Sequence, residues 1–152
     1  MKIYCLSVNS EDNLSGVPKW EWSLSFAYLQ AYYSTSKYYD KTKFVNGTFF
    51  ESTSISRIHS DISFHKPDIL AVSCYCWGMD AVLALLNELA TTDLEMRIIL
   101  GGPEISLQSE NIMLAYPSVD VCVIGEGEIT FTEILDCYHK NNAGESFGSI
   151  NG

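Results

Sequence analysis

The stretch DILAVSCYCWGMDAVLALLNELATTDLEMRIILGGPEIS, from Asp68 to Ser106, contains the pattern that decides the fold. It begins with an apolar run, Asp68 to Ser73, and continues with apolar residues at helical spacing from Met79 to Ala90. A second short apolar run follows at Arg97 to Leu100. Neither run alternates with polar residues, which is typical of parallel strands covered by helices on both faces. The stretch therefore predicts a strand–helix–strand unit of an α/β domain.

The rest of the chain repeats the order of strand and helix. Further strands are predicted at Ile3 to Val8, Lys43 to Phe50 and Val119 to Ile124, although Asn46-Gly47 could instead form a tight turn. The predicted helices are Trp22 to Tyr33, a short helix capped by Ser54 and ending near Phe64, Met79 to Ala90, Ser106 to Tyr116 and Ile129 to His139.

Five such units joined by right-handed crossovers predict a three-layer αβα sandwich around a parallel five-stranded sheet. The expected strand order is the flavodoxin-like 2-1-3-4-5, with a switch point between strands 1 and 3. Ligands bind at such points, at the carboxyl ends of the strands. This predicts a crevice lined by the segments Ser7 to Asp12, with Ser7 and Asn9 as candidates, and Ser73 to Gly78. The glycine-rich loops Gly101 to Glu104 and Gly125 to Glu128 would extend it.

Composition excludes several classes of partner. The chain has 152 residues, enough for one domain with a sizeable core. A formal net charge of −10, with only nine Lys and Arg, argues against nucleic acid and anionic lipid as partners. No apolar run approaches the ~20 residues of a membrane span, and the first residues are too short and polar for a secretory signal. We therefore expect a cytoplasmic domain.

Metal sites and catalytic groups are not indicated. The five cysteines include one CxC pair, Cys74 and Cys76, but no further ligands at the spacing of a zinc or iron–sulfur site. The three histidines fall on predicted helices or helix ends, away from the carboxyl edge of the sheet. Glu126 and Glu128 could act as paired carboxylates, but we favour a helix-opening role for Glu128. Trp77 is either a lid on the core or a stacking surface.

Two common ligands of this topology fit poorly. A flavin phosphate would meet two acids in the loop after the first strand, at Glu11 and Asp12. A phospho-receiver domain would need an aspartate where strand 3 ends in Ser73 and a lysine where strand 5 ends at Gly125. The GxGxxG motif and the P-loop are both absent, so a stand-alone nucleotide or flavin enzyme is disfavoured.

Together with PSVDVCVIGEGEITFTEIL, from Pro117 to Leu135, the opening stretch resembles a known family. The matching features are the serine that ends strand 3, the GGPE turn after strand 4, Asp120 before strand 5, and the GEGE turn that leads into a Thr-Phe helix. The two turns at this spacing are far more specific than either alone. The chain resembles the cobalamin (B12)-binding domain found amino-terminal to radical S-adenosylmethionine (SAM) enzymes.

The resemblance implies that the corrin lies over the carboxyl edge of the sheet and that its nucleotide tail enters a groove between strands, with its phosphate near helix N-terminal amides. The residues that would line the tail or corrin are Ser73, Cys74, Tyr75 and Trp77. Those that would allow close approach are Gly101, Gly102, Pro103 and Glu104, and those that would close the other side are Gly125, Glu126 and Gly127.

Two motifs of related proteins are missing. The DxHxxG motif, which supplies an axial histidine to cobalt, does not occur, so the resemblance implies cobalamin without a histidine ligand from this chain. The CxxxCxxC motif is also absent, which places S-adenosylmethionine and the [4Fe-4S] cluster in a separate carboxyl-terminal radical SAM domain. We expect a cobalamin-binding domain at residues 1–140 and a linker toward that domain at residues 141–152.

The resemblance suggests a parent enzyme that transfers methyl groups to an unreactive carbon or phosphorus centre, or catalyses a related radical rearrangement. The domain itself would hold cobalamin and catalyse nothing unaided. The alternative is a degenerate scaffold that binds no cofactor and packs on the radical SAM core. A crevice already filled by Trp77 and Tyr75 would favour that alternative.

Overall fold

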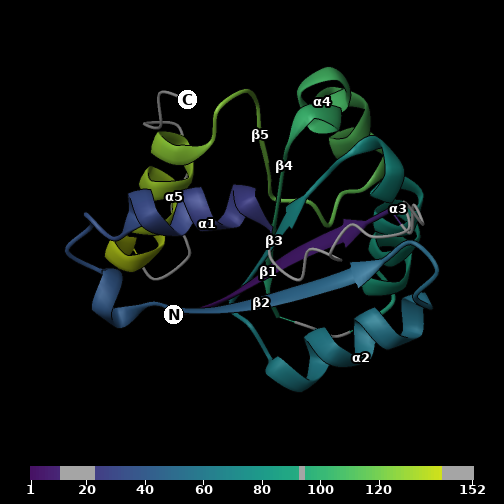
Figure 1. The fold of residues 1–152 in the computed structure, drawn as a ribbon, viewed down its shortest axis with the longest axis horizontal. Helices are drawn as coiled ribbons and strands as arrows, with labels where there is room; N and C mark the ends of the chain where they lie inside the picture. Colours follow the sequence, from purple (N-terminus) through teal and green to yellow (C-terminus); the bar gives the residue numbers. More distant parts are fainter. Residues whose placement is uncertain (11–22, 93–94, 142–152) are drawn as a thin grey trace, which may run out of the picture.

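The computed structural model describes residues 1–10, 23–92 and 95–141 (Figure 1). Its elements in chain order are β1 (Lys2–Asn9), α1 (Leu24–Tyr33), the 3-10 helix η1 (Tyr39–Lys41), β2 (Lys43–Phe50), α2 (Ile55–His65), β3 (Ile69–Ser73), the 3-10 helix η2 (Cys76–Gly78), α3 (Met79–Leu89), β4 (Arg97–Gly101), α4 (Pro103–Ala115), β5 (Val121–Val123) and α5 (Glu128–Asn141). No helix within these residues is long and apolar enough to cross a membrane.

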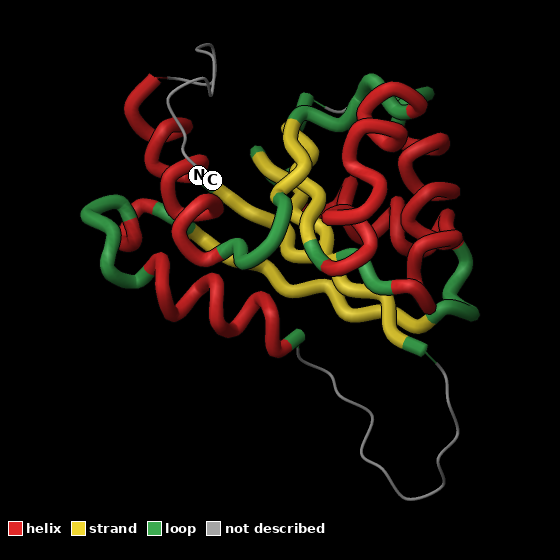
Figure 2. The backbone as a smooth tube through the Cα atoms, turned by 90° about the horizontal axis from the view of Figure 1, so that it is seen from above, coloured by secondary structure: helices red, strands yellow, loops and turns green. Residues whose placement is uncertain are grey.

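The five strands form one parallel sheet in the order β2-β1-β3-β4-β5, which confirms the predicted flavodoxin-like topology. Helices α1 and α5 cover one face, and α2, α3 and α4 cover the other (Figure 2). Each face has its own apolar core, because alternate residues of β1 and β3 point to opposite sides. The α1/α5 face buries Ile3, Cys5, Phe26, Tyr33, Ile69, Ala71, Ile99, Val123, Phe131, Ile134 and Leu135.

The GGPE turn is shorter than predicted. Helix α4 begins at Pro103 rather than at Ser106, and Gly102 alone forms its N-cap. Gly102 has a φ of 112°, a conformation that side chains with a Cβ rarely adopt, and proline at the first helical position has the φ that a helix needs. The predicted loop Gly101 to Glu104 is therefore a strand end, a one-residue cap and the first turn of a helix.

Asn46 and Gly47 lie inside β2 and do not form a turn. Gly47 is required there because the side chain of Tyr4, on the neighbouring strand β1, lies directly over it. The hydroxyl of Tyr4 then reaches α2 and donates a hydrogen bond to the Asp61 carboxylate. Burial, together with this carboxylate, raises the pKa of Tyr4 above its ordinary value. The glycine thus allows one tyrosine to connect β1, β2 and α2.

We expect Gly47→Ala to lower the free energy of unfolding by about 1–3 kcal/mol, the usual effect of overpacking a core. A Cβ at this position would overlap the Tyr4 hydroxyl and lie 2.5 Å from its ring, so the tyrosine must move. Urea unfolding followed by circular dichroism measures the change. A loss below about 0.5 kcal/mol, the range of neutral surface substitutions, would contradict this packing.

His139 connects the end of α5 to the segment between α1 and β2. Its Nε2 lies 2.8 Å from Thr42 Oγ1, and its ring stacks on Tyr38 with centroids 4.8 Å apart. Burial, followed by the positive charges of the N-terminus and Lys41, lowers the pKa of His139, and Asp136 opposes that shift. The folded domain therefore prefers the neutral imidazole.

This preference predicts that stability falls on mild acidification. The contribution of His139 is complete above its unfolded pKa of about 6.5 and is lost as the pH falls through the lower folded value, because only the unfolded chain binds the proton between the two. Urea unfolding at about pH 7.5 and about pH 5.5 measures the effect. We expect His139→Gln to make the fall with acid smaller, and an unchanged fall in that variant would assign it to other groups.

Candidate functional site

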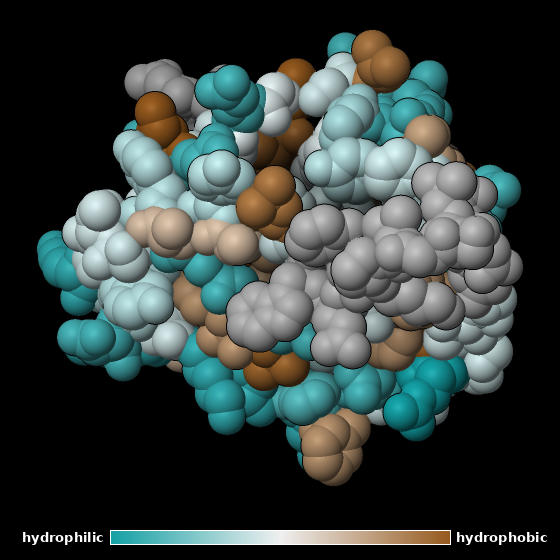
Figure 3. Space-filling view, in the orientation of Figure 1, coloured by the Kyte–Doolittle hydropathy of each residue, from teal (hydrophilic) through white to brown (hydrophobic). Residues whose placement is uncertain are grey.

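A cavity of about 520 Å³ opens at the carboxyl edge of the sheet, on the face covered by α1 and α5. Its floor consists of the ends of β3, β4 and β5, which contribute Ala71, Val72, Ser73, Ile99, Gly101 and Val123. The hollow lies between α4 and α5 in the space-filling view, with apolar side chains inside it (Figure 3).

The walls come from three helices, the GEGE turn and the segment between β3 and η2. Helix α1 contributes Ser25, Phe26, Tyr28 and Leu29, and α5 contributes Glu128 and Phe131. The remaining wall consists of Tyr75, Gly102, Pro103, Ser106, Gly125, Glu126 and Gly127. Most of these groups are apolar or aromatic, and the polar ones are hydroxyls and carboxylates. Such a lining suits a neutral, largely apolar ligand with few hydrogen-bonding atoms.

Two glycines shape the rim for different reasons. A Cβ on Gly102 would lie 2.6 Å from the carbonyl oxygen of Cys74, so the close contact of α4 with the end of β3 requires glycine. Gly125 has a φ of 78° with no atom within 4 Å of a Cβ, so its backbone conformation alone favours glycine. The N–H of Gly125 donates to Ser106 Oγ at 3.0 Å, which ties the GEGE turn to α4.

The structure brings eight of the thirteen predicted site residues into one cavity lining. They are Ser73, Tyr75, Gly101, Gly102, Pro103, Gly125, Glu126 and Gly127. The five that do not line it are Ser7, Asn9, Cys74, Trp77 and Glu104. Segments distant in sequence therefore meet at this edge, as the position of the two glycine turns predicts.

Two of the remaining five, Ser7 and Trp77, lie close to the lining. Ser7 is buried and pairs in register with Ser73, so it lies one strand away from the floor, and its hydroxyl is 3.5 Å from Thr48 Oγ1. Trp77 is 45% exposed and stacks on Tyr75, with ring centroids 4.8 Å apart. Trp77 is therefore not a lid on the core, and it does not fill the cavity.

The other three residues take part in the packing and hydrogen bonding of the domain itself. Cys74 is fully buried among the residues under α3 and α4, and burial raises the pKa of its thiol to about 12. Glu104 lies in the first turn of α4, where its carboxylate accepts a hydrogen bond from Gln108. Asn9 is the last residue of β1, and its carbonyl accepts the N–H of Glu51.

The amino end of α4 is not an open anion site. Pro103 has no N–H, and the N–H of Glu104 donates to the carbonyl of Cys74 at 3.5 Å. The N–H groups of Ile105 and Ser106 both donate to the carbonyl of Gly102. A ligand phosphate would therefore find these donors of α4 already engaged.

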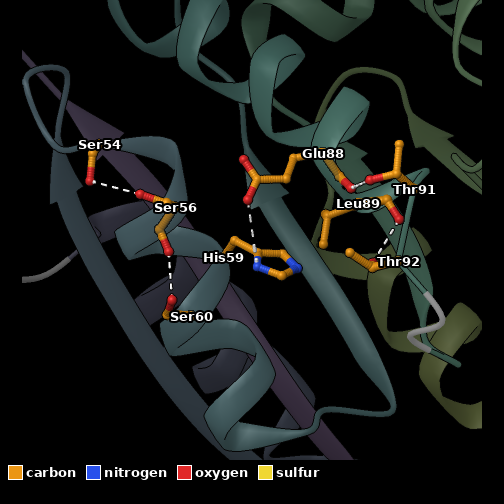
Figure 4. A network of polar contacts seen from close by, with 8 residues as sticks. All are labelled: Ser54, Ser56, His59, Ser60, Glu88, Leu89, Thr91 and Thr92. Atoms are coloured by element: carbon orange, nitrogen blue, oxygen red, sulfur yellow. Dashed lines mark hydrogen bonds and ion pairs between the residues drawn. The ribbon is translucent and has the colours of Figure 1, made fainter.

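All three histidines lie in described helices, and none of them lines the cavity. His59 lies between α2 and α3 on the opposite face of the sheet, with its Nδ1 3.7 Å from the Glu88 carboxylate (Figure 4). His65 ends α2, and His139 lies near the end of α5. Within the described residues, no cluster of His, Cys, Asp and Glu could hold a metal ion.

Sequence reasoning missed the contribution of α1. Ser25 Oγ of this helix lies 3.0 Å from Ser73 Oγ, and Ser23 Oγ lies 2.7 Å from Ser25 Oγ. Three hydroxyls thus form a hydrogen-bonded series that ends on the cavity floor. Local sequence gives no signal for this arrangement, because it arises only when α1 packs on the same face as α5.

The family model for the B12 binding domain matches residues 43–135. The chain belongs to the B12-binding domain family. The matched segment contains both glycine turns and the serine at the end of β3, whereas β1 and α1 lie before it.

Two curated relatives are radical SAM or methyltransferase enzymes. The chain is 33% identical over 70 residues to the cobalamin-dependent radical SAM methyltransferase TokK of Streptomyces tokunonensis, a match that covers 46% of this chain and 10% of that protein. It is 35% identical over 69 residues to 2-(S-pantetheinyl)-carbapenam-3-carboxylate methyltransferase of Streptantibioticus cattleyicolor, covering 45% and 10%. These matches therefore span about a tenth of the length of either relative.

A solved structure shares the fold over almost the whole chain. The cobalamin-dependent S-adenosylmethionine radical enzyme OxsB, determined with aqua-cobalamin and S-adenosylmethionine bound, superposes with a TM-score of 0.70 at 20% identity. The match covers 97% of this chain and 20% of OxsB. The domain is thus related to the cobalamin-binding domains of cobalamin-dependent radical SAM methyltransferases and shares its fold with one part of a much larger enzyme.

Proposed function

We propose that this domain binds cobalamin at the carboxyl edge of its sheet, with the base of the cofactor's nucleotide tail inside the cavity bounded by α1, α4 and α5. The single observation that carries the proposal is the coincidence of an open 520 Å³ cavity with the GGPE and GEGE turns. That volume lies within the range of about 300–1,000 Å³ typical of small-molecule sites. The apolar floor and one buried hydroxyl, Ser73, suit a planar base with few polar atoms.

The surface near this edge suits the wider corrin. Leu24 and Tyr28 of α1 are 70% and 60% exposed, and Ile124 and Ile129 beside the GEGE turn are 58% and 56% exposed. Apolar groups of this size favour contact with a flat ring over contact with water. Bound cobalamin supplies a cobalt centre that carries an alkyl group. The protein's part is to bind and orient that ring, and cobalt receives no histidine from this chain.

The proposal places the domain in a larger enzyme. A separate radical SAM domain carries S-adenosylmethionine and the [4Fe-4S] cluster, and the residues 141–152 lead toward it. Methyl transfer is the proposed reaction of the whole protein, and a cytoplasmic location belongs to the same proposal. The names of the curated relatives support the radical SAM domain and the methyl transfer. Residues 142–152 lie outside the described residues, so the linker remains part of the proposal.

Absorbance titration with hydroxocobalamin tests the proposed binding. We expect a saturable change in the corrin spectrum, because the base that coordinates cobalt in free hydroxocobalamin must leave the metal to enter the cavity. His59→Gln and His65→Gln should leave that change intact, since neither histidine lines the cavity. No spectral or calorimetric signal at high micromolar ligand, in protein shown to be folded, would contradict the proposal.

A second candidate is the scaffold that binds no cofactor and packs on the radical SAM core. The observation that favours it is an apolar pair on α4, Leu107 and Leu114, which are 83% and 81% exposed and two helical turns apart. The open cavity and the outward position of Trp77 favour cofactor binding instead. A failed titration with folded protein would support the scaffold.

A further inference from the structure

We infer that Ser25 of α1 is a positioning residue that acts through Ser73 to select the base of the cofactor's nucleotide tail. The inference rests on the proposed function and goes beyond it, because it identifies how the cavity distinguishes one base from another. Ser25 lies before the segment matched by the family model, which begins at Lys43. The family match therefore does not include this residue.

Two neighbouring serine hydroxyls line a cavity that is otherwise largely apolar. Ser73 is 7% exposed, ends β3 and lines the cavity floor. Its hydroxyl lies 3.0 Å from that of Ser25, which also lines the cavity and belongs to the first turn of α1. The other floor groups from β3, β4 and β5 are apolar side chains and a glycine. A base that reaches the floor therefore meets one hydrogen-bonding side chain there.

Serine hydroxyls have one proton to donate and two lone pairs to accept with. When Ser25 donates to Ser73, the proton of Ser73 is available to a ring nitrogen of the ligand. Ser23 supplies the next hydroxyl, 2.7 Å from Ser25, and it can donate to Ser25 in turn. The protons of Ser23 and Ser25 then point along the series toward Ser73, and only the Ser73 proton is left for a ligand. The series thus favours a planar heterocycle that presents an acceptor nitrogen at its inner edge.

A base without such a nitrogen leaves the buried Ser73 proton without a ligand partner. The loss of one neutral hydrogen bond is equivalent to about 3- to 10-fold in affinity. Removal of Ser25 frees the Ser73 hydroxyl to rotate, so the proton no longer points at the base. Loss of the Ser25 hydroxyl should therefore weaken only those ligands that carry the tail.

Calorimetric titrations of Ser25→Ala with two ligands test the inference. The ligands are hydroxocobalamin and cobinamide, which has the same corrin but lacks the nucleotide tail. We expect about 3- to 10-fold weaker binding of hydroxocobalamin and unchanged binding of cobinamide. Ser25→Thr keeps the hydroxyl and should restore most of the affinity. Ser60→Ala, on the exposed side of α2, is the matched control and should bind both ligands like the wild type.

A double variant separates positioning from general destabilisation. Because Ser25 acts through Ser73, Ser25→Ala combined with Ser73→Ala should bind hydroxocobalamin within about twofold of Ser73→Ala alone. Additive losses, equal losses for both ligands, or an unchanged affinity of Ser25→Ala for hydroxocobalamin would each overturn the inference. The last result, with a wild type that binds, leaves the proposed function standing. A wild type that binds neither ligand contradicts the proposed function itself.

Discussion

Replacement of Ala71 by leucine is expected to weaken hydroxocobalamin binding by at least about tenfold, equivalent to about 1.4 kcal/mol. Ala71 is 2% exposed and forms part of the cavity floor between Cys5 and Ile99 of the neighbouring strands. A leucine there would extend into the space proposed for the nucleotide tail. Calorimetric titration measures the loss. The domain should remain folded, because the cavity can hold the added atoms without displacing its neighbours.

The matched control is Ala31→Leu, which adds the same atoms on the exposed side of α1. It should bind hydroxocobalamin like the wild type. Urea unfolding of both variants separates loss of binding from loss of structure. Wild-type affinity in a folded Ala71→Leu protein would show that the tail does not use this cavity.

Gly102→Ala is expected to lower the free energy of unfolding by about 2–4 kcal/mol. Two effects add: the backbone at φ 112° and ψ 175°, unfavourable for alanine by about 1–3 kcal/mol, and a Cβ only 2.6 Å from the Cys74 carbonyl oxygen. The atoms that the Cβ would meet all belong to the backbone of Cys74 and not to a flexible side chain, so α4 must shift from the end of β3. Because Gly102 and Pro103 form part of the cavity wall, the same shift should weaken cobalamin binding. Chemical denaturation and a hydroxocobalamin titration measure the two effects.

Gly125→Ala provides the comparison for the backbone effect alone. Its φ of 78° is also positive, but no atom lies within 4 Å of the added Cβ, so we expect only about 1–2 kcal/mol. Gly101→Ala has neither problem, since its Cβ would meet Val123 at an ordinary 3.7 Å. If Gly102→Ala destabilised the domain no more than Gly125→Ala, the close contact with Cys74 would not contribute to the requirement for glycine at position 102.

The sheet order could be predicted because the relevant signals are local. Buried apolar runs such as Ile69–Ser73, each followed by a helical pattern, determine a parallel sheet, and the handedness of crossovers limits its topology. The sequence does not decide whether Asn46-Gly47 forms a turn or a strand, because the same dipeptide suits a tight turn and a strand beneath a large side chain. Only the packing of Tyr4 on Gly47 distinguishes them.

The candidate site was predictable in part for the same reason. Glycine turns at the ends of β4 and β5 lie at the carboxyl edge of any parallel sheet, so Gly102 and Gly125 could be placed there from the sequence. The wall that α1 supplies depends on tertiary packing. Nothing in the spacing of Ser23 and Ser25 indicates that their hydroxyls reach the end of β3. The start of α4 was misplaced because Pro103 suits both a loop and a first helical turn.

A crystal structure of the domain saturated with hydroxocobalamin is the most direct test of the central claim. We expect the base of the nucleotide tail in the cavity bounded by α1, α4 and α5, on the floor formed by Ala71, Ile99 and Val123, with a base nitrogen within hydrogen-bonding distance of Ser73. A bound corrin whose tail lies outside an otherwise unchanged cavity would contradict it.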